Sequence, residues 1–289
     1  MTSPVTTLPR SVVEALALRI SKGQLALPVL PAVTQNVLQL SFDENCDGKK
    51  LSALIHQDQS LASHLLRIAN SPAYAPTDPI VSLQQAVTRL GIGKIREIAL
   101  LVIANATELK VAGWEAWIRT MFTLGLAAGM YAKRIAKERR WNAEEGFLCG
   151  LLHGIGRPVL LHALSEIEIE LKVDVLQGLP AEVVEKTIES LHPRVGGMLL
   201  KSWKLPVRLA DTISQQHHFE QATEVAQTVS MTALAADLAR HAMALPTRHA
   251  DITQHPMLWP LNCYEDELAG HLAAGPDIFQ AAEQMARTL

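Results

Sequence analysis

Residue types that bind metal ions are concentrated in the second half of the chain. They are His153 in the stretch GLLHGIGR, His192, the pair His217 and His218, and Asp237 inside the apolar stretch TALAADLARHA. Neutral imidazole and carboxylate groups suit iron, manganese or zinc. We expect them on successive helices of a bundle, where several could converge on one interior point. For any single one of them, the alternative is an ordinary capping, solvated or hydrogen-bonded interior group.

The elements that must position these residues are predicted to be helices. Alanine and leucine are abundant and aromatic residues make up only 4% of the chain, which favours helix. Apolar residues recur at helical spacing almost everywhere and alternate as in a strand almost nowhere. Capping patterns predict helix starts at Asp47, Asp58, Ser82 and Asn142 and a stop at Gly91. Further helices are predicted over 114–140, up to His192-Pro193, and over 221–243.

This pattern predicts an all-α fold of two packed helical lobes. We expect an N-terminal helix in residues 1–24, a first lobe over about 25–110, a second over about 114–240, and a C-terminal helical tail over 241–289. A proline-rich connector, SPAYAPTDPI, lies inside the first lobe. The interval between the lobes is too short for independent motion, so both are expected to form one compact unit. Trp203 and Trp259 are predicted to be packing residues.

Composition excludes several classes of protein. The 289 residues are 48% apolar, which indicates a globular chain. The net charge of −3 gives no reason to expect a general nucleic-acid binder. The three cysteines show no paired spacing and are interpreted as free thiols in a reducing compartment. We see neither a signal-peptide pattern nor an apolar run long enough for a bilayer, and therefore expect a cytoplasmic protein without membrane association.

Several motifs occur in a specific order over about two hundred residues. They are LPVLPAV, LASHLLRIANSPAY and VSLQQAVTRLGIGKIREIAL, followed by GLLHGIGRPVL and LHPRVGGMLLKSWKLPVRLADTISQQHH. In this order they resemble the HDOD family, the output-domain relatives of the HD phosphohydrolase superfamily. The resemblance implies an HD-like helical bundle in the second lobe. It also implies a bacterial signal-transduction and regulatory domain, of a kind often joined to receiver or cyclic di-GMP turnover domains.

The resemblance further implies a degenerate metal site. Active HD phosphohydrolases bind metal through an early histidine, an adjacent His-Asp pair and a late aspartate. Here the pair is His153-Gly154, and Arg119 stands where metal-binding relatives carry the early histidine. We therefore expect no bound metal, no cofactor and no catalytic residue, with His153, His192, His217, His218 and Asp237 as a vestigial set. We hypothesise that Arg119 pairs with Asp237, and that His153 bonds to Asp237 or to a backbone carbonyl.

Two classes of function remain open. The first is a non-catalytic regulatory module that binds partner proteins, such as separate receiver or cyclic di-GMP turnover proteins. Such a module could also bind a ligand. The second is a metal-dependent phosphohydrolase or cyclic-nucleotide phosphodiesterase. Nothing in the sequence specifies the seam of a homodimer, although helical signalling proteins commonly dimerise. Asn70, Ser71 and Arg157 are candidate binding or lobe-junction residues.

The basic stretch YAKRIAKERRW has two interpretations. It could bind phosphate or a nucleotide, and salt-dependent affinity would be the mark of such binding. The favoured interpretation is a solvated helix end whose cations complement the helix dipole. The cations concerned are Lys133, Arg134, Lys137, Arg139 and Arg140.

Overall fold

The computed structural model describes residues 7–43, 45–71, 78–106, 111–219 and 222–288, and no strand occurs among them. The expected all-α class is confirmed. The helices are α1 (Arg10–Ser21), α2 (Ala32–Phe42), α3 (Gly48–Ile55), α4 (Gln59–Ala69), α5 (Leu83–Ala106), α6 (Glu115–Glu138), α7 (Ala143–Leu152), α8 (Gly156–Leu171), α9 (Ala181–Ser202), α10 (Val207–Gln215), α11 (Ala226–Ala242), the 3-10 turn η2 (Ile252–Gln254), α12 (Glu265–Ala273) and α13 (Gly275–Thr288).

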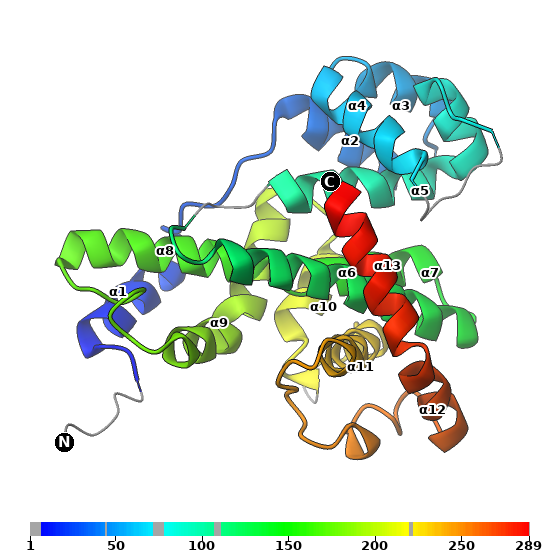
Figure 1. The fold of residues 1–289 in the computed structure, drawn as a ribbon. Helices are drawn as coiled ribbons and strands as arrows, with labels where there is room; N and C mark the ends of the chain where they lie inside the picture. Colours follow the sequence, from blue (N-terminus) through cyan, green and yellow to red (C-terminus); the bar gives the residue numbers. More distant parts are fainter. Residues whose placement is uncertain (1–6, 44, 72–77, 107–110, 220–221, 289) are drawn as a thin grey trace.

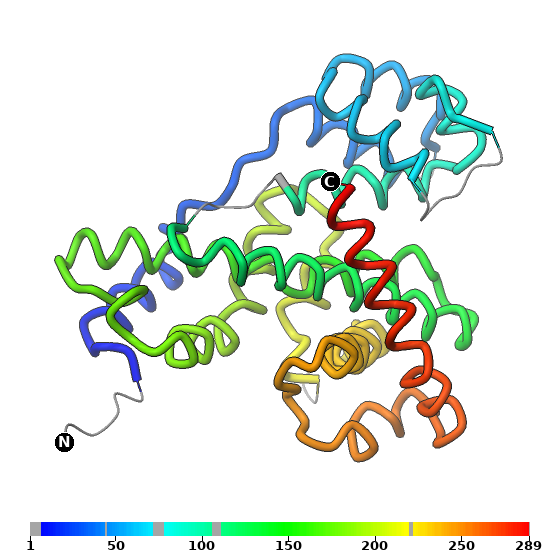
Figure 2. The backbone as a smooth tube through the Cα atoms, viewed as in Figure 1, coloured from blue at the N-terminus to red at the C-terminus, as the bar shows by residue number. Residues whose placement is uncertain are grey.

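The helices form two lobes that share one hydrophobic core (Figure 1). Helices α2 to α5 make the first lobe, and α6 to α11 make the second. Helix α1 lies beside α8 of the second lobe, and residues 22–31 then lead to the first (Figure 2). Arg19 fixes α1 there through ion pairs with Glu166 at 2.8 Å and Glu170 at 2.6 Å. In the C-terminal tail, α13 packs across α6.

The predicted caps are the local signals that place these helices. Asp58 accepts a hydrogen bond from the backbone N–H of Leu61, and Asn142 accepts from those of Glu144 and Glu145. Each side chain satisfies N–H groups that the first helical turn leaves free. At Gly91 the backbone leaves the helical region with φ +80°, so α5 is kinked at the predicted stop. Asp47 and Ser82 also accept the expected backbone hydrogen bonds.

Helix α9 does not end at His192-Pro193, so that prediction was wrong. The helix continues through Pro193 to Ser202. A proline costs one backbone hydrogen bond, but α9 packs against both α8 and α10, and this packing overrides the local preference. The contact with α8 is very close, since a Cβ on Gly156 would lie 2.2 Å from the His192 carbonyl oxygen.

Other sequence expectations have mixed outcomes. Trp203 is buried and its indole N–H donates to the Pro28 carbonyl at 2.8 Å, whereas Trp259 is 81% exposed and is not a packing residue. The expected start of the late helix at Gln221 and most of the 71–80 connector lie outside the described residues. The stretch Ala143–Leu171 is long and apolar enough to span a membrane, but 83% of its most apolar window is buried inside the protein.

We expect Gly156→Ala to destabilise the protein by roughly 1–3 kcal/mol, because the added methyl group must displace the backbone of α9. The free energy of unfolding in urea measures this effect. Gly270→Ala in α12 is the matched control, since its nearest neighbour would be a side-chain nitrogen at 3.5 Å. That variant should be neutral or slightly stabilised. Equal stability of both variants would contradict the close α8–α9 contact.

Candidate functional site

The candidate site is a cavity of about 610 Å³ in the second lobe. Its walls come from α6, the turn between α7 and α8, the start of α8, α9, the segment after α10, α11 and the segment that follows α11. His153, His217 and Asp237 line it, together with Arg157. The His192 ring lies next to it, with its centroid 5.1 Å from that of His217 and 6.5 Å from that of His153. Of the five metal-capable residues, only His218 is exposed and lies apart.

His153 is held as a neutral imidazole. Its Nδ1 lies 2.7 Å from the carbonyl oxygen of Gly150, and its Nε2 lies 3.3 Å from Nη1 of Arg157. A carbonyl can only accept and a guanidinium can only donate, so Nδ1 carries the proton and Nε2 accepts. Burial, and next the charge of Arg157, lower the pKa of His153 to about 3. The lone pair that would bind a metal ion is therefore engaged by a guanidinium group.

Arg157 is the central cation of the site. It is 1% exposed, and its Nε and Nη2 donate to the two oxygens of Glu189 at 2.7 and 3.0 Å. Arg240 pairs with the same carboxylate at 2.8 Å. Burial alone would raise the pKa of Glu189, but the charge of Arg157 holds it well below the usual range. One carboxylate between two guanidinium groups ties α8, α9 and α11 together.

Gly154 makes room for this guanidinium. A Cβ atom at position 154 would lie 2.0 Å from Nη1 of Arg157. The side chain of Arg157 therefore lies over the position where active relatives of the resembled family would carry the aspartate of the His-Asp pair. A side chain at position 154 and the guanidinium group of Arg157 would therefore compete for the same space.

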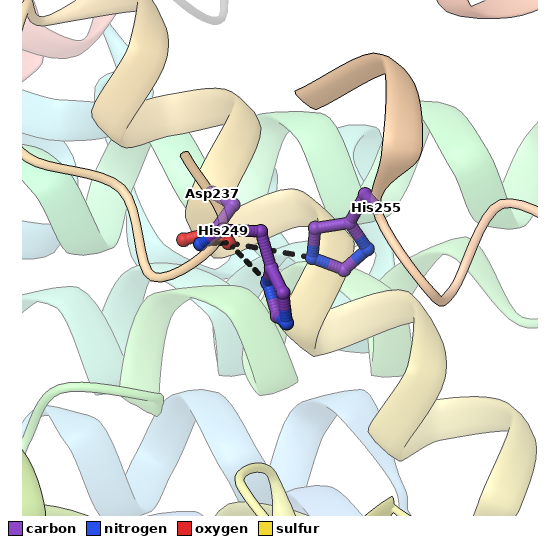
Figure 3. A group of neighbouring side chains, drawn as sticks. All are labelled: Asp237, His249 and His255. Carbon is purple, nitrogen blue, oxygen red and sulfur yellow. Dashed lines mark hydrogen bonds and ion pairs between the residues drawn. The ribbon is translucent and has the colours of Figure 1, made fainter. Parts of the chain in front are cut away.

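The carboxylate of Asp237 is hydrogen-bonded to the segment that follows α11. It accepts from the backbone N–H groups of Arg248 and His249 at 3.0 and 3.2 Å, and from Nδ1 of His249 at 2.9 Å. His255 lies on its other side (Figure 3). Burial would raise the pKa of Asp237, but the neighbouring His255 imidazole, foremost, and the hydrogen bonds from Arg248 and His249 lower it to about 2. The hypothesised pair between Arg119 and Asp237 was wrong, because among the described residues Asp237 pairs with His249 and His255, and Arg119 is exposed elsewhere on α6.

The residues present do not fit the metal set of active HD enzymes. Gly154 offers no ligand atom, and the Nε2 lone pair of His153 faces a guanidinium group. Arg119 is exposed and its side chain supplies no neutral nitrogen. No chemical step through a metal ion held by that set follows from this geometry.

Comparison with known proteins agrees with the architecture. The model of the HDOD domain matches residues 27–219. The chain belongs to the HDOD family. An uncharacterized protein of Treponema pallidum (strain Nichols) is 25% identical over 206 residues, which are 68% of this chain and only 39% of that protein. The chain thus spans less than half of that relative.

Solved structures share the HDOD fold over nearly the whole chain. A proposed phosphohydrolase from Shewanella amazonensis SB2B is 22% identical with a TM-score of 0.71, covering 95% of this chain and 98% of that one. An HDOD domain protein from Geobacter sulfurreducens has a TM-score of 0.70 at 22% identity, with 95% and 99% covered. A proposed signal transduction protein from Marinobacter aquaeolei VT8 has a TM-score of 0.70 at 18% identity, with 97% and 67% covered.

Two further sequence candidates lie outside the cavity of this HDOD protein. Asn70 ends α4 and closes the connector inside the first lobe, with its side-chain amide bonded to both backbone groups of Ile80 at 2.8 Å. Ser71 beside it is buried.

In the basic stretch, Lys133 binds the buried carboxylate of Glu97 and Arg139 binds Glu267. These two cations pair with neighbouring elements, so the solvated interpretation does not describe them.

Sequence reasoning missed four residues whose side chains contact the charged groups of the site. Glu189 lies three residues before His192 and Arg240 lies three after Asp237, so helical spacing could have placed both on the functional faces. His249 and His255 lie in an irregular segment, where no periodicity marks them. The missed residues are Glu189, Arg240, His249 and His255.

Because burial lowers the pKa of His153, the stability of the folded protein depends on pH. In the folded state the His153 ring takes up a second proton, and so becomes charged, only near pH 3. In the unfolded chain it does so near pH 6.5. Stability is therefore complete above about pH 6.5 and falls on acidification through this window; at pH 5 this single group accounts for about 2 kcal/mol. Urea unfolding at pH 7 and pH 5 measures the loss, which His153→Gln should reduce. The exposed His218→Gln is the control, and an unchanged loss in His153→Gln would contradict the assignment.

Proposed function

We propose that this HDOD protein is a non-catalytic signal-transduction module that regulates partner proteins by binding them. The observation that supports it most is the buried guanidinium of Arg157, which engages Nε2 of His153 and covers Gly154. In an active HD site the metal ion lowers the pKa of a bound water and stabilises the phosphoryl oxygens. A fixed guanidinium group supplies neither a coordinated water nor an open ligand position.

Exposed aromatic side chains in the tail support the protein-binding part of the proposal. Trp259 is 81% and Tyr264 is 63% exposed, and large aromatic residues are enriched at protein interfaces. We propose separate receiver or cyclic di-GMP turnover proteins as partners. The three cysteines are free thiols, which supports action in a reducing compartment such as the cytoplasm.

A metal-dependent phosphohydrolase or cyclic-nucleotide phosphodiesterase is the second candidate. The cavity of about 610 Å³ is large enough for a small phosphate ester, and His153 and Asp237 both line it. The Shewanella relative that is named a proposed phosphohydrolase has the same fold. Against this candidate stand the missing ligand at Gly154 and the engaged lone pair of His153.

A phosphodiesterase assay separates the two candidates. We expect the purified protein, supplied with manganese, iron or zinc, to hydrolyse bis(p-nitrophenyl) phosphate and cyclic dinucleotides no faster than its Asp237→Ala variant. The physical reason is that the buried Arg157 cation excludes a second cation from His153. Metal-dependent turnover that disappears in both His153→Ala and Asp237→Ala would overturn the non-catalytic proposal.

A further inference from the structure

A second group of metal-capable atoms surrounds Asp237 on the side of the tail. Its Oδ2 lies 2.9 Å from Nδ1 of His249 and 3.4 Å from Nε2 of His255. All three potential ligand atoms lie within 4.8 Å of one another. Figure 3 shows both imidazole rings turned toward the carboxylate. Asp237 comes from α11, and both histidines come from the segment that follows it.

We propose that Asp237, His249 and His255 form a binding site for a divalent transition-metal ion such as zinc. This site shares only Asp237 with the set that active HD enzymes use. Its two histidines lie beyond residue 219, where the match to the HDOD domain ends. Two imidazole nitrogens and one carboxylate oxygen are a common zinc ligand set that leaves a fourth position for water.

The state of His255 points independently to a ligand. Its side chain is fully buried, and its Nε2 lacks a hydrogen-bond partner among the described residues. The Asp237 oxygen at 3.4 Å satisfies the distance of an ion pair only. A buried polar nitrogen without a partner is costly and rare in native proteins. A metal ion between His255 and Asp237 would satisfy this nitrogen.

Metal binding requires a change of tautomer at both rings. Nδ1 of His255 accepts from the backbone N–H of Met257 at 3.1 Å, which places the proton of the neutral ring on Nε2. Coordination through Nε2 moves that proton to Nδ1 and breaks this hydrogen bond. Coordination of His249 through Nδ1 likewise moves its proton to Nε2 and replaces its hydrogen bond to Asp237. Both losses are small beside the energy of coordinating a metal ion. His249 binds through Nδ1, and its second ring nitrogen points away from Asp237 (Figure 3).

The proposed ion has a defined structural effect. Arg248, His249 and His255 all line the cavity, so a metal ion would fasten this wall to α11. Occupancy would therefore control how firmly the tail closes the cavity. The proposed metal ion would also give the Asp237 carboxylate a role, although its neighbours do not complete the ligand set of active HD enzymes.

Isothermal titration with zinc chloride after chelator treatment tests the site, with elemental analysis of the washed protein. We expect one zinc per chain, and a loss of affinity of at least about 100-fold in His249→Ala and in His255→Ala. His153→Ala and the exposed His218→Ala should bind zinc as the wild type does. Zinc should also raise the unfolding temperature of the wild type and not that of the two tail variants.

Two outcomes would overturn the proposal. One is the absence of zinc binding by the folded wild-type protein. The other is loss of binding in His153→Ala with retention in His249→Ala, which would assign the ion to the family's own site. Because His249 is partly exposed, its variant is expected to fold, and circular dichroism checks this for each protein.

Discussion

The buried ion pair between Arg157 and Glu189 is the interaction on which the site depends. A guanidinium group that is 1% exposed is tolerated only with its charge paired, and removing one partner of such a pair typically costs about 3–5 kcal/mol. Glu189 also binds Arg240, so a single carboxylate joins three helices of the second lobe. Burial and the charge of the Arg157 guanidinium group keep His153 neutral, and that group also donates the hydrogen bond to its Nε2.

His153 and Asp237, two of the residues that the family resemblance assigns to the metal set, both bond to groups of the protein itself. His153 bonds to Arg157 inside the domain, whereas Asp237 bonds to Arg248 and His249 in the tail. Arg157 lies one helical turn from His153, whereas Arg248 and His249 lie in a segment outside the family match.

Most of the fold could be predicted from local sequence signals, whereas the site depends on contacts between residues far apart in the sequence. Caps such as Asp58 and the kink at Gly91 depend on a few neighbouring residues, so sequence patterns predicted them. Pro193 was misinterpreted because packing from both sides keeps α9 continuous. Arg157 and Glu189 are 32 residues apart, and no local pattern specifies that pair. Arg119 was chosen from motif alignment alone, and its exposure is set by how α6 packs.

The most direct measurement is the protonation and metal response of the His153 ring by long-range ¹H–¹⁵N NMR, assigned with His153→Gln. We expect a neutral ring at pH 7 and pH 5, with the proton on Nδ1 and an Nε2 resonance that saturating zinc leaves unchanged. The cause is the hydrogen bond from Arg157 at 3.3 Å. A zinc-induced shift of Nε2, or a proton on that atom, would show that Arg157 does not replace the metal ion at His153.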